Sequence, residues 1–131
     1  MRKDIKIPPV ENLYLAVTAE YNEAFKGNDY YVYLINQRDS DLEMVLVLSQ
    51  GQDGDRKTSD MRHKIERLPA RSFARLELMQ EEVLRLNNSF KVTFFEGSRM
   101  FEKDFLLKKG SLKEGSLRHI KILNKRGILL K

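Results

Sequence analysis

The sequence has 131 residues, the length of a single domain with room for one modest core. Hydrophobic residues make up 41% and charged residues 33%, a mixture too apolar for a disordered chain. The net charge of +5 permits an acidic partner or nucleic acid without requiring either. The lack of cysteine excludes disulfides, thiolate metal sites and thiol catalysis. No apolar run is long enough to span a membrane and the N-terminus has no secretory signal, so we expect a cytoplasmic protein.

Three segments in the first half of the chain have the composition of strands. Residues 12–22 and 29–37 are rich in β-branched and aromatic residues, which suit a pleated surface. Residues 42–48 form a nearly continuous apolar run, which is typical of a central strand covered on both faces. The polar residues 37–41 predict a short turn before this third segment.

The next segment, residues 60–68, fits two structures. As a strand it would have two faces, one with Met61, His63 and Ile65 and the other with Arg62, Lys64 and Glu66. Its apolar residues also fall at helical spacing, so a short helix stays open as an alternative. In both cases the proline that follows at position 69 ends the element.

Alternation of apolar and polar residues is clearer in the second half of the chain. In residues 72–79 it separates Ala74, Leu76 and Leu78 on one face from Arg75 and Glu77 on the other. Residues 90–95 and 100–109, joined by the turn at 96–99, give the strongest hairpin signal. One face of the first strand holds Phe90, Val92 and Phe94, and one face of the second holds Phe101, Lys103, Phe105 and Leu107. Residues 81–86 predict a single helical turn.

These elements predict a mainly β fold with about seven strands and one short helical turn. A single-domain antiparallel β-sandwich of the immunoglobulin-like kind, spanning residues 1–131, buries the apolar faces best. A small barrel is the alternative architecture. Residues 110–131 are too apolar for a free tail, so we expect them to dock on the sandwich and to add an edge strand, with Gly127 marking a turn.

The polar segment at residues 49–63 contains pieces of a phosphate-binding loop. Gly54, Lys57 and Thr58 follow an apolar strand, but the two residues between Gly54 and Lys57 break the spacing that such a loop requires. Asp53 and Asp55 would also repel a phosphate. We therefore expect a polar loop between two strands.

Metal binding and catalysis have little support in the sequence. Asp53, Asp55 and Asp60 do not match the twelve-residue calcium loop, which also needs a final carboxylate. The two histidines, His63 and His119, have no partner motif for a hydrolytic triad or a zinc site. The sequence therefore assigns no residue to catalysis, to a cofactor or to a metal.

Two groups of residues are candidates for binding. The densest basic stretch could form a sheet face that binds single-stranded nucleic acid; its residues are Arg62, Lys64, Arg67, Arg71 and Arg75. A possible interaction face is formed by Tyr30, Tyr31 and Tyr33. The alternative for both groups is an ordinary solvated face, with the tyrosines packed at sheet edges.

Five stretches carry a resemblance to a known family: DYYVYLINQ, MVLVLSQGQDGDRKTSDMRH, LPARSFARLELM, LNNSFKVTFFEG and KRGILLK. In these stretches the chain resembles small bacterial proteins of about this length that are labelled phenylalanyl-tRNA synthetase alpha-chain-like. The label implies ATP-dependent attachment of phenylalanine to tRNA. The chain lacks the glycine-rich motif of a class II synthetase, and its nearest Arg-x-Glu string, Arg75-Leu76-Glu77, lies within an alternating strand. No catalytic residue is therefore carried over.

Two functions of different classes follow. A non-enzymatic sandwich would bind another protein, or another copy of itself, through a sheet edge or face. An RNA- or tRNA-associated accessory domain would instead use the basic stretch. An enzyme is the least favoured reading because no synthetase, phosphate-loop or triad motif is present. We expect no cofactor and no membrane partner in either case.

Overall fold

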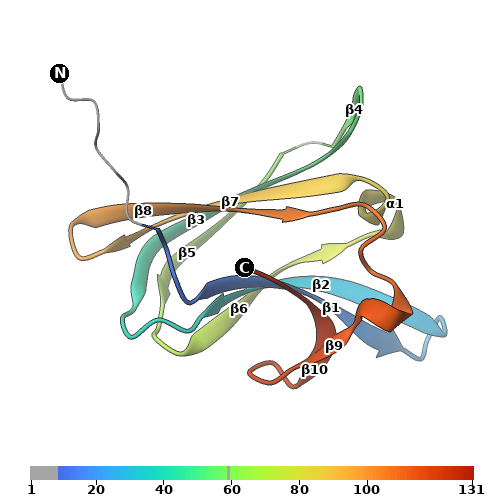
Figure 1. Cartoon of the computed structure of the whole chain (residues 1–131), viewed down its shortest axis with the longest axis horizontal. Helices are drawn as coiled ribbons and strands as arrows, with labels where there is room; N and C mark the ends of the chain where they lie inside the picture. Colours follow the sequence, from blue (N-terminus) through green and yellow to red (C-terminus); the bar gives the residue numbers. More distant parts are fainter. Residues whose placement is uncertain (1–8, 59) are drawn as a thin grey trace.

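The computed structural model describes residues 9–58 and 60–131. It confirms the expected sandwich, because two antiparallel sheets lie face to face as two layers (Figure 1). The described residues form ten strands rather than about seven. The elements are β1 (Leu13–Asn22), β2 (Gly27–Asn36), β3 (Leu42–Asp53), β4 (Arg56–Lys57), β5 (Met61–Leu68), β6 (Ser72–Met79), α1 (Glu81–Leu84), β7 (Asn87–Glu96), β8 (Arg99–Leu107), the 3-10 turn η1 (Glu114–Ser116), β9 (Arg118–Ile120) and β10 (Lys125–Leu130).

The two sheets are held together by the inward side chains of their strands. Sheet A contains, in spatial order, β6, β2, β1, β10 and β9. Sheet B contains β4, β3, β7 and β8, and β5 pairs with the first part of β3. The chain therefore crosses between the layers after β2, β5, β6 and β8. The small barrel is not the fold, because the strands divide into two separate sheets.

Alternation along the strands fills the space between the sheets. In β7 the side chains of Phe90, Val92 and Phe94 are at most 1% exposed, as the sequence predicts. The Phe94 ring stacks on the Phe101 ring of β8, with 5.4 Å between their centroids. Each large apolar side chain buried in this way contributes about 1.5–3 kcal/mol to the free energy of unfolding. This core fixes which face of every strand remains outside.

The hairpin between β7 and β8 is confirmed. Phe90 faces Phe105 and Phe94 faces Phe101 across the two strands. The two-residue turn between Glu96 and Arg99 begins with Gly97, whose φ is +64°. Glycine at the first position of such a turn adopts this conformation without strain and gives the strands their right-handed twist.

The segment from residue 110 adds two strands to sheet A rather than one. β10 pairs with β1, and β9 pairs with β10 at the edge of the sheet. The turn between them lies at residues 121–124, so the expectation that Gly127 marks a turn is wrong. Gly127 lies within β10, where a Cβ atom would come within 2.3 Å of the Val17 carbonyl oxygen. The absence of a side chain is what lets β10 approach β1 this closely.

The β9–β10 turn bends back over the outer face of sheet A. It buries Ile120 and Leu123 against Ala16, Tyr33 and Ile35, which form a second, smaller apolar cluster. In Figure 1 the turn of this hairpin lies below the other strands of sheet A, on the side away from sheet B. Sheet A is thus covered over part of its outer face, whereas the part around Phe73 and Leu78 of β6 remains open on that side.

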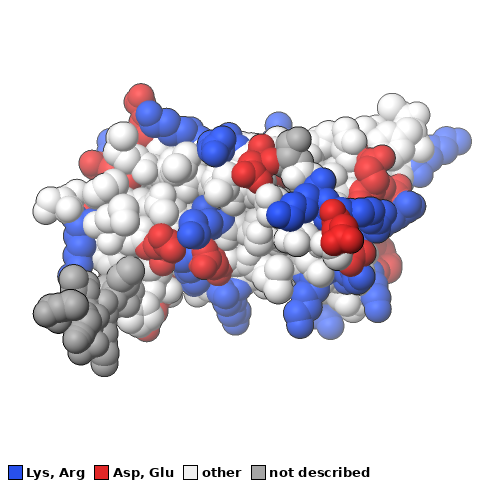
Figure 2. All heavy atoms as spheres, turned by 90° about the horizontal axis from the view of Figure 1, so that it is seen from above, with Lys and Arg blue, Asp and Glu red and all other residues white. Residues whose placement is uncertain are grey.

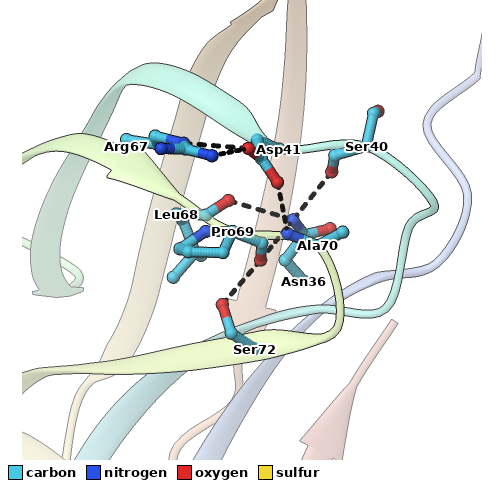
Figure 3. A network of polar contacts seen from close by, with 8 residues as sticks. All are labelled: Asn36, Ser40, Asp41, Arg67, Leu68, Pro69, Ala70 and Ser72. Carbon is cyan, nitrogen blue, oxygen red and sulfur yellow. Dashed lines mark hydrogen bonds and ion pairs between the residues drawn. The ribbon is translucent and has the colours of Figure 1, made fainter.

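One buried asparagine ties two of the crossings together (Figure 3). Asn36, the last residue of β2, is fully buried, and its Nδ2 donates to the carbonyl oxygens of Ser40, Leu68 and Pro69 at 3.0–3.2 Å. Its Oδ1 accepts from the backbone N–H of Arg38 at 2.9 Å. The β2–β3 and β5–β6 connections therefore share one hydrogen-bonded corner. A buried amide is tolerated there because its partners satisfy it.

Candidate functional site

The segment at residues 60–68 is a strand, and its basic residues do not form one patch. β5 places Arg62 opposite Leu48 and Lys64 opposite Leu46 of β3, on the outer face of sheet B. Figure 2 views the molecule from the side of sheet B and shows Lys and Arg interspersed with Asp and Glu. The potential of this face is therefore mixed rather than uniformly positive.

The remaining basic residues of the stretch lie elsewhere and have partners. Arg67 pairs with Asp41, with Nε 2.8 Å from Oδ2, and Arg71 pairs with Asp39 at the corner of the sandwich. A hydrogen bond from the backbone N–H of Ala70, followed by the Arg67 contact, holds the pKa of Asp41 below its usual 3.8. The structure thus spreads the five predicted nucleic-acid contacts over both sheets and one corner.

The three tyrosines of β2 also divide between the two faces of their sheet. Tyr30 packs against the main core, whereas Tyr31 and Tyr33 point to the outer face of sheet A. Tyr33 is 4% exposed, and its hydroxyl donates to Glu20 Oε2 at 2.9 Å. Burial and this contact with a carboxylate raise the pKa of Tyr33 to about 12. Tyr33 is therefore part of the packing, and only Tyr31 remains available at the surface.

Glu20 is the centre of a hydrogen-bond network on the outer face of sheet A. Its carboxylate accepts from Thr18 at 2.8 Å, from Tyr33 and from Lys125 Nζ at 3.2 Å. Burial acts to raise the pKa of Glu20, but these three hydrogen bonds outweigh burial and hold the pKa below its usual 4.5. The network links β1, β2 and β10, so it fixes the position of the outer face rather than presenting a free carboxylate.

The open part of sheet A presents a small aromatic and cationic surface, which we call the β2–β6 face. It consists of Tyr31, Phe73, Arg75 and Leu78. The Arg75 guanidinium lies 4.5 Å from the centroid of the Tyr31 ring. Phe73 is 43% exposed and Leu78 is 50% exposed, so two large apolar side chains flank the arginine.

A β-bulge in β6 creates this surface and corrects the predicted alternation. Val32 of β2 pairs with Glu77 and the next residue, Tyr33, pairs with Arg75, so Leu76 is an extra residue in β6. Up to Leu76 the predicted faces hold. Beyond it they are exchanged, which turns Glu77 inward and Leu78 outward.

The inward Glu77 meets Ser49 and His63 on the open side of the sandwich. His63 Nε2 lies 2.5 Å from Glu77 Oε1, and Ser49 Oγ donates to the same oxygen at 3.1 Å. A hydrolytic triad would need the imidazole between the hydroxyl and the carboxylate. Here the carboxylate lies between the other two groups. The cluster therefore joins β6 to β3 and β5, and it does not activate Ser49.

Sequence reasoning missed this cluster because the bulge is what brings Glu77 inside. His63 was recognised as a candidate, but its partners lie 14 residues away in each direction. The alternation of apolar and polar residues in a sequence does not indicate where a strand will contain a β-bulge.

The residues that resemble a phosphate loop form a hairpin. β3 extends to Asp53, and β4 pairs Arg56 with Asp53 and Lys57 with Gln52. The backbone N–H of Gly51 donates to Thr58 Oγ1 at 2.8 Å, so this donor is already used. Gly54 has a φ of +61° and turns the chain, in agreement with the polar loop expected from the sequence.

The aspartates of this hairpin have protein partners. Asp53 accepts from Lys109 Nζ at 3.0 Å, and Asp60 accepts from Gln50. Within residues 9–58 and 60–131 there is no group of three His, Cys, Asp or Glu side chains that could hold a metal ion. In the same part of the chain no helix has the length and apolarity to cross a bilayer.

Comparisons with known proteins add no family. No protein-family model matches the chain, and a search of curated proteins finds no similar sequence.

Proposed function

We propose that the protein is a non-enzymatic interaction module that binds a protein partner through the β2–β6 face. The observation that carries this proposal is the composition of that face. Tyrosine, phenylalanine and arginine are the residues that protein interfaces favour, and here they lie together and open to solvent. As part of the proposal we keep the immunoglobulin-like arrangement that the sequence predicts for the two sheets. We keep the cytoplasm as its proposed location.

A face, rather than a sheet edge, is the proposed mode of binding because each edge carries a feature that discourages strand pairing. β5 has charged side chains at every second position on its outer face, β6 contains the bulge at Leu76, and β9 is only three residues long. β8 directs Lys103 inward between Phe101 and Phe105. Charges, bulges, short strands and inward lysines are the usual means of preventing edge-to-edge association.

The test compares two double variants in affinity capture from the native lysate. Phe73→Ala/Leu78→Ala removes the apolar part of the β2–β6 face. Met100→Ala/Leu106→Ala removes a matched pair on β8, where the side chains are 53% and 50% exposed. We expect a protein recovered by the native chain to lose at least tenfold in yield with the first variant and to be retained by the second.

Other results of the same experiment would contradict the proposal. Equal loss in both variants would mean that the face has no special role. Recovery of RNA in place of protein would favour the RNA-associated alternative, which rests on the basic stretch and on the resemblance to synthetase-like proteins. Sedimentation of the purified chain with and without the Phe73 substitution would reveal whether the partner is a second copy.

A further inference from the structure

A groove lies on the other half of the outer face of sheet A, between β1, β2 and the β9–β10 hairpin. Its volume is about 470 Å³, which falls in the range of small-molecule sites. Its apolar wall is formed by Tyr14, Ile35, Ile120, Ile122, Ile128 and Leu129. We call this space the β9 groove. It lies on the same outer face as the β2–β6 face, but none of the four residues of that face lines the groove.

The charge of the β9 groove has one sign. Arg118, His119 and Lys121 line it, and none of the described residues that line it is acidic. The guanidinium of Arg118 donates to the carbonyl oxygens of Gly115 and Leu117 at 2.9 and 3.0 Å, which holds it beside the groove without neutralising it. Among the described residues, no carboxylate forms an ion pair with Arg118 or Lys121. The nearby cation Arg126 is different, because it pairs with Glu114 at 2.8 Å.

An apolar wall beside unneutralised cations selects for a ligand with both characters. An alkyl chain that packs against the isoleucines is removed from water, which favours binding. An anionic head group is attracted by the positive charges of Arg118 and Lys121. We propose that the β9 groove binds an amphipathic carboxylate, that is, a small acid with an unbranched alkyl chain. This inference goes beyond the proposed interaction face and does not depend on it.

The test uses decanoate, octanoate and decanol as probes, with binding followed by titration calorimetry and by NMR shifts of backbone amides. We expect decanoate to bind about tenfold more tightly than octanoate, because two further methylene groups are buried. We expect decanol to bind at least tenfold more weakly than decanoate because it lacks the charge. The shifts should be concentrated in residues 118–122 and at Tyr14.

Matched charge reversals locate the site. Arg118→Glu/Lys121→Glu should weaken decanoate binding by tenfold or more. Arg62→Glu/Lys64→Glu changes the net charge equally on the outer face of sheet B and should leave the affinity unchanged. Both pairs of side chains are at the surface, so thermal unfolding should report intact folds. Phe73→Ala/Leu78→Ala should also bind decanoate normally, which separates this site from the interaction face.

Any one of the following results overturns the proposal. Decanol could bind as well as decanoate, the groove reversal could bind as tightly as the native chain, or the amide shifts could lie outside the groove. Absence of decanoate binding below its micellar concentration would overturn it as well, and it would leave the interaction face untouched.

Discussion

Arg38 and Glu96 form a shielded ion pair that joins the β2–β3 connection to the end of β7. Two nitrogens of the guanidinium donate to the two carboxylate oxygens at 2.7 and 2.8 Å, and each side chain is 18% exposed. The guanidinium also lies 5.7 Å from the centroid of the Phe94 ring and 5.6 Å from that of Phe101. Such a bidentate, partly desolvated pair contributes more than an exposed one.

The pH dependence of stability should report this pair. The hydrogen bonds from Arg38 hold the pKa of Glu96 below its usual 4.5, although burial opposes them. The stabilisation is therefore fully present above about pH 4.5 and is lost as the pH falls through the lower folded pKa. Glu96→Gln should lower the free energy of unfolding by about 2 kcal/mol at pH 7 and by little at pH 3. Urea denaturation at a series of pH values measures this.

A matched substitution keeps the interpretation specific. Glu66→Gln removes an exposed carboxylate from β5 and should change the unfolding free energy by less than about 0.5 kcal/mol at either pH. A Glu96 variant that stayed equally destabilised at pH 3 would show that packing, rather than the carboxylate charge, accounts for the effect.

At the scale of a strand, Lys103 is the inward charge of edge strand β8. Its Nζ donates to the Leu13 carbonyl oxygen at 2.9 Å and lies 5.1 Å from the centroid of the Phe105 ring. Burial, and then the charge of Arg38, lowers the pKa of Lys103 below its usual 10.5. A second chain pairing with β8 would bury this ammonium further, so the lysine opposes edge-to-edge association.

Replacing Lys103 should therefore expose β8 to self-association. We expect Lys103→Met to increase the dimer or aggregate fraction several-fold at a fixed protein concentration, as measured by sedimentation velocity. Lys91→Met is the control, because Lys91 lies on the outer face of central strand β7, where no edge is free. Equal association of the two variants would mean that added apolar surface, and not the edge, is responsible.

The alternation of side chains predicts most strands but not their irregularities. The faces of β7 and β8 follow from a period of two, because the buried residues of these strands repeat without interruption. The extra residue at Leu76 has no such signal, since Arg-Leu-Glu-Leu continues the alternating pattern through the bulge. The interaction face could therefore be predicted only as far as Tyr31. The positions of Phe73 and Leu78 on this face follow only from the pairing of β6 with β2 in the structure.

For the whole molecule, composition and period predict two stacked sheets, whereas long-range pairing decides the sites. His63 meets Glu77 and Ser49 because three strands of two sheets converge there, and no local pattern encodes that meeting. The β9 groove likewise depends on where a C-terminal hairpin folds back. The same hairpin shows why Gly127 was misread: glycine is permissive in turns, but here a neighbouring backbone requires it.

The distribution of charge over the molecule predicts weak nucleic-acid binding. Arg67 and Arg71 pair with Asp41 and Asp39, and the other three basic residues of the stretch lie on two opposite faces. Few of them can contact one phosphate backbone together. In gel-shift titrations with tRNA, we expect no retardation at physiological salt and a shallow salt dependence below it. Tight binding with a steep salt slope, lost in Arg62→Glu/Lys64→Glu, would contradict this expectation.

The pairing of β1 with β10 has a consequence for how the chain acquires its structure. Leu15 lies opposite Leu130, so the second neighbour of β1 in sheet A is supplied more than a hundred positions later. While the ribosome is still synthesising the chain, β1 can pair only with β2. During this time the apolar patch around Ala16 and Ile35 remains exposed to solvent. Closing so distant a contact is entropically slow. Nascent chains should thus stay protease-sensitive along β1 until synthesis passes β10.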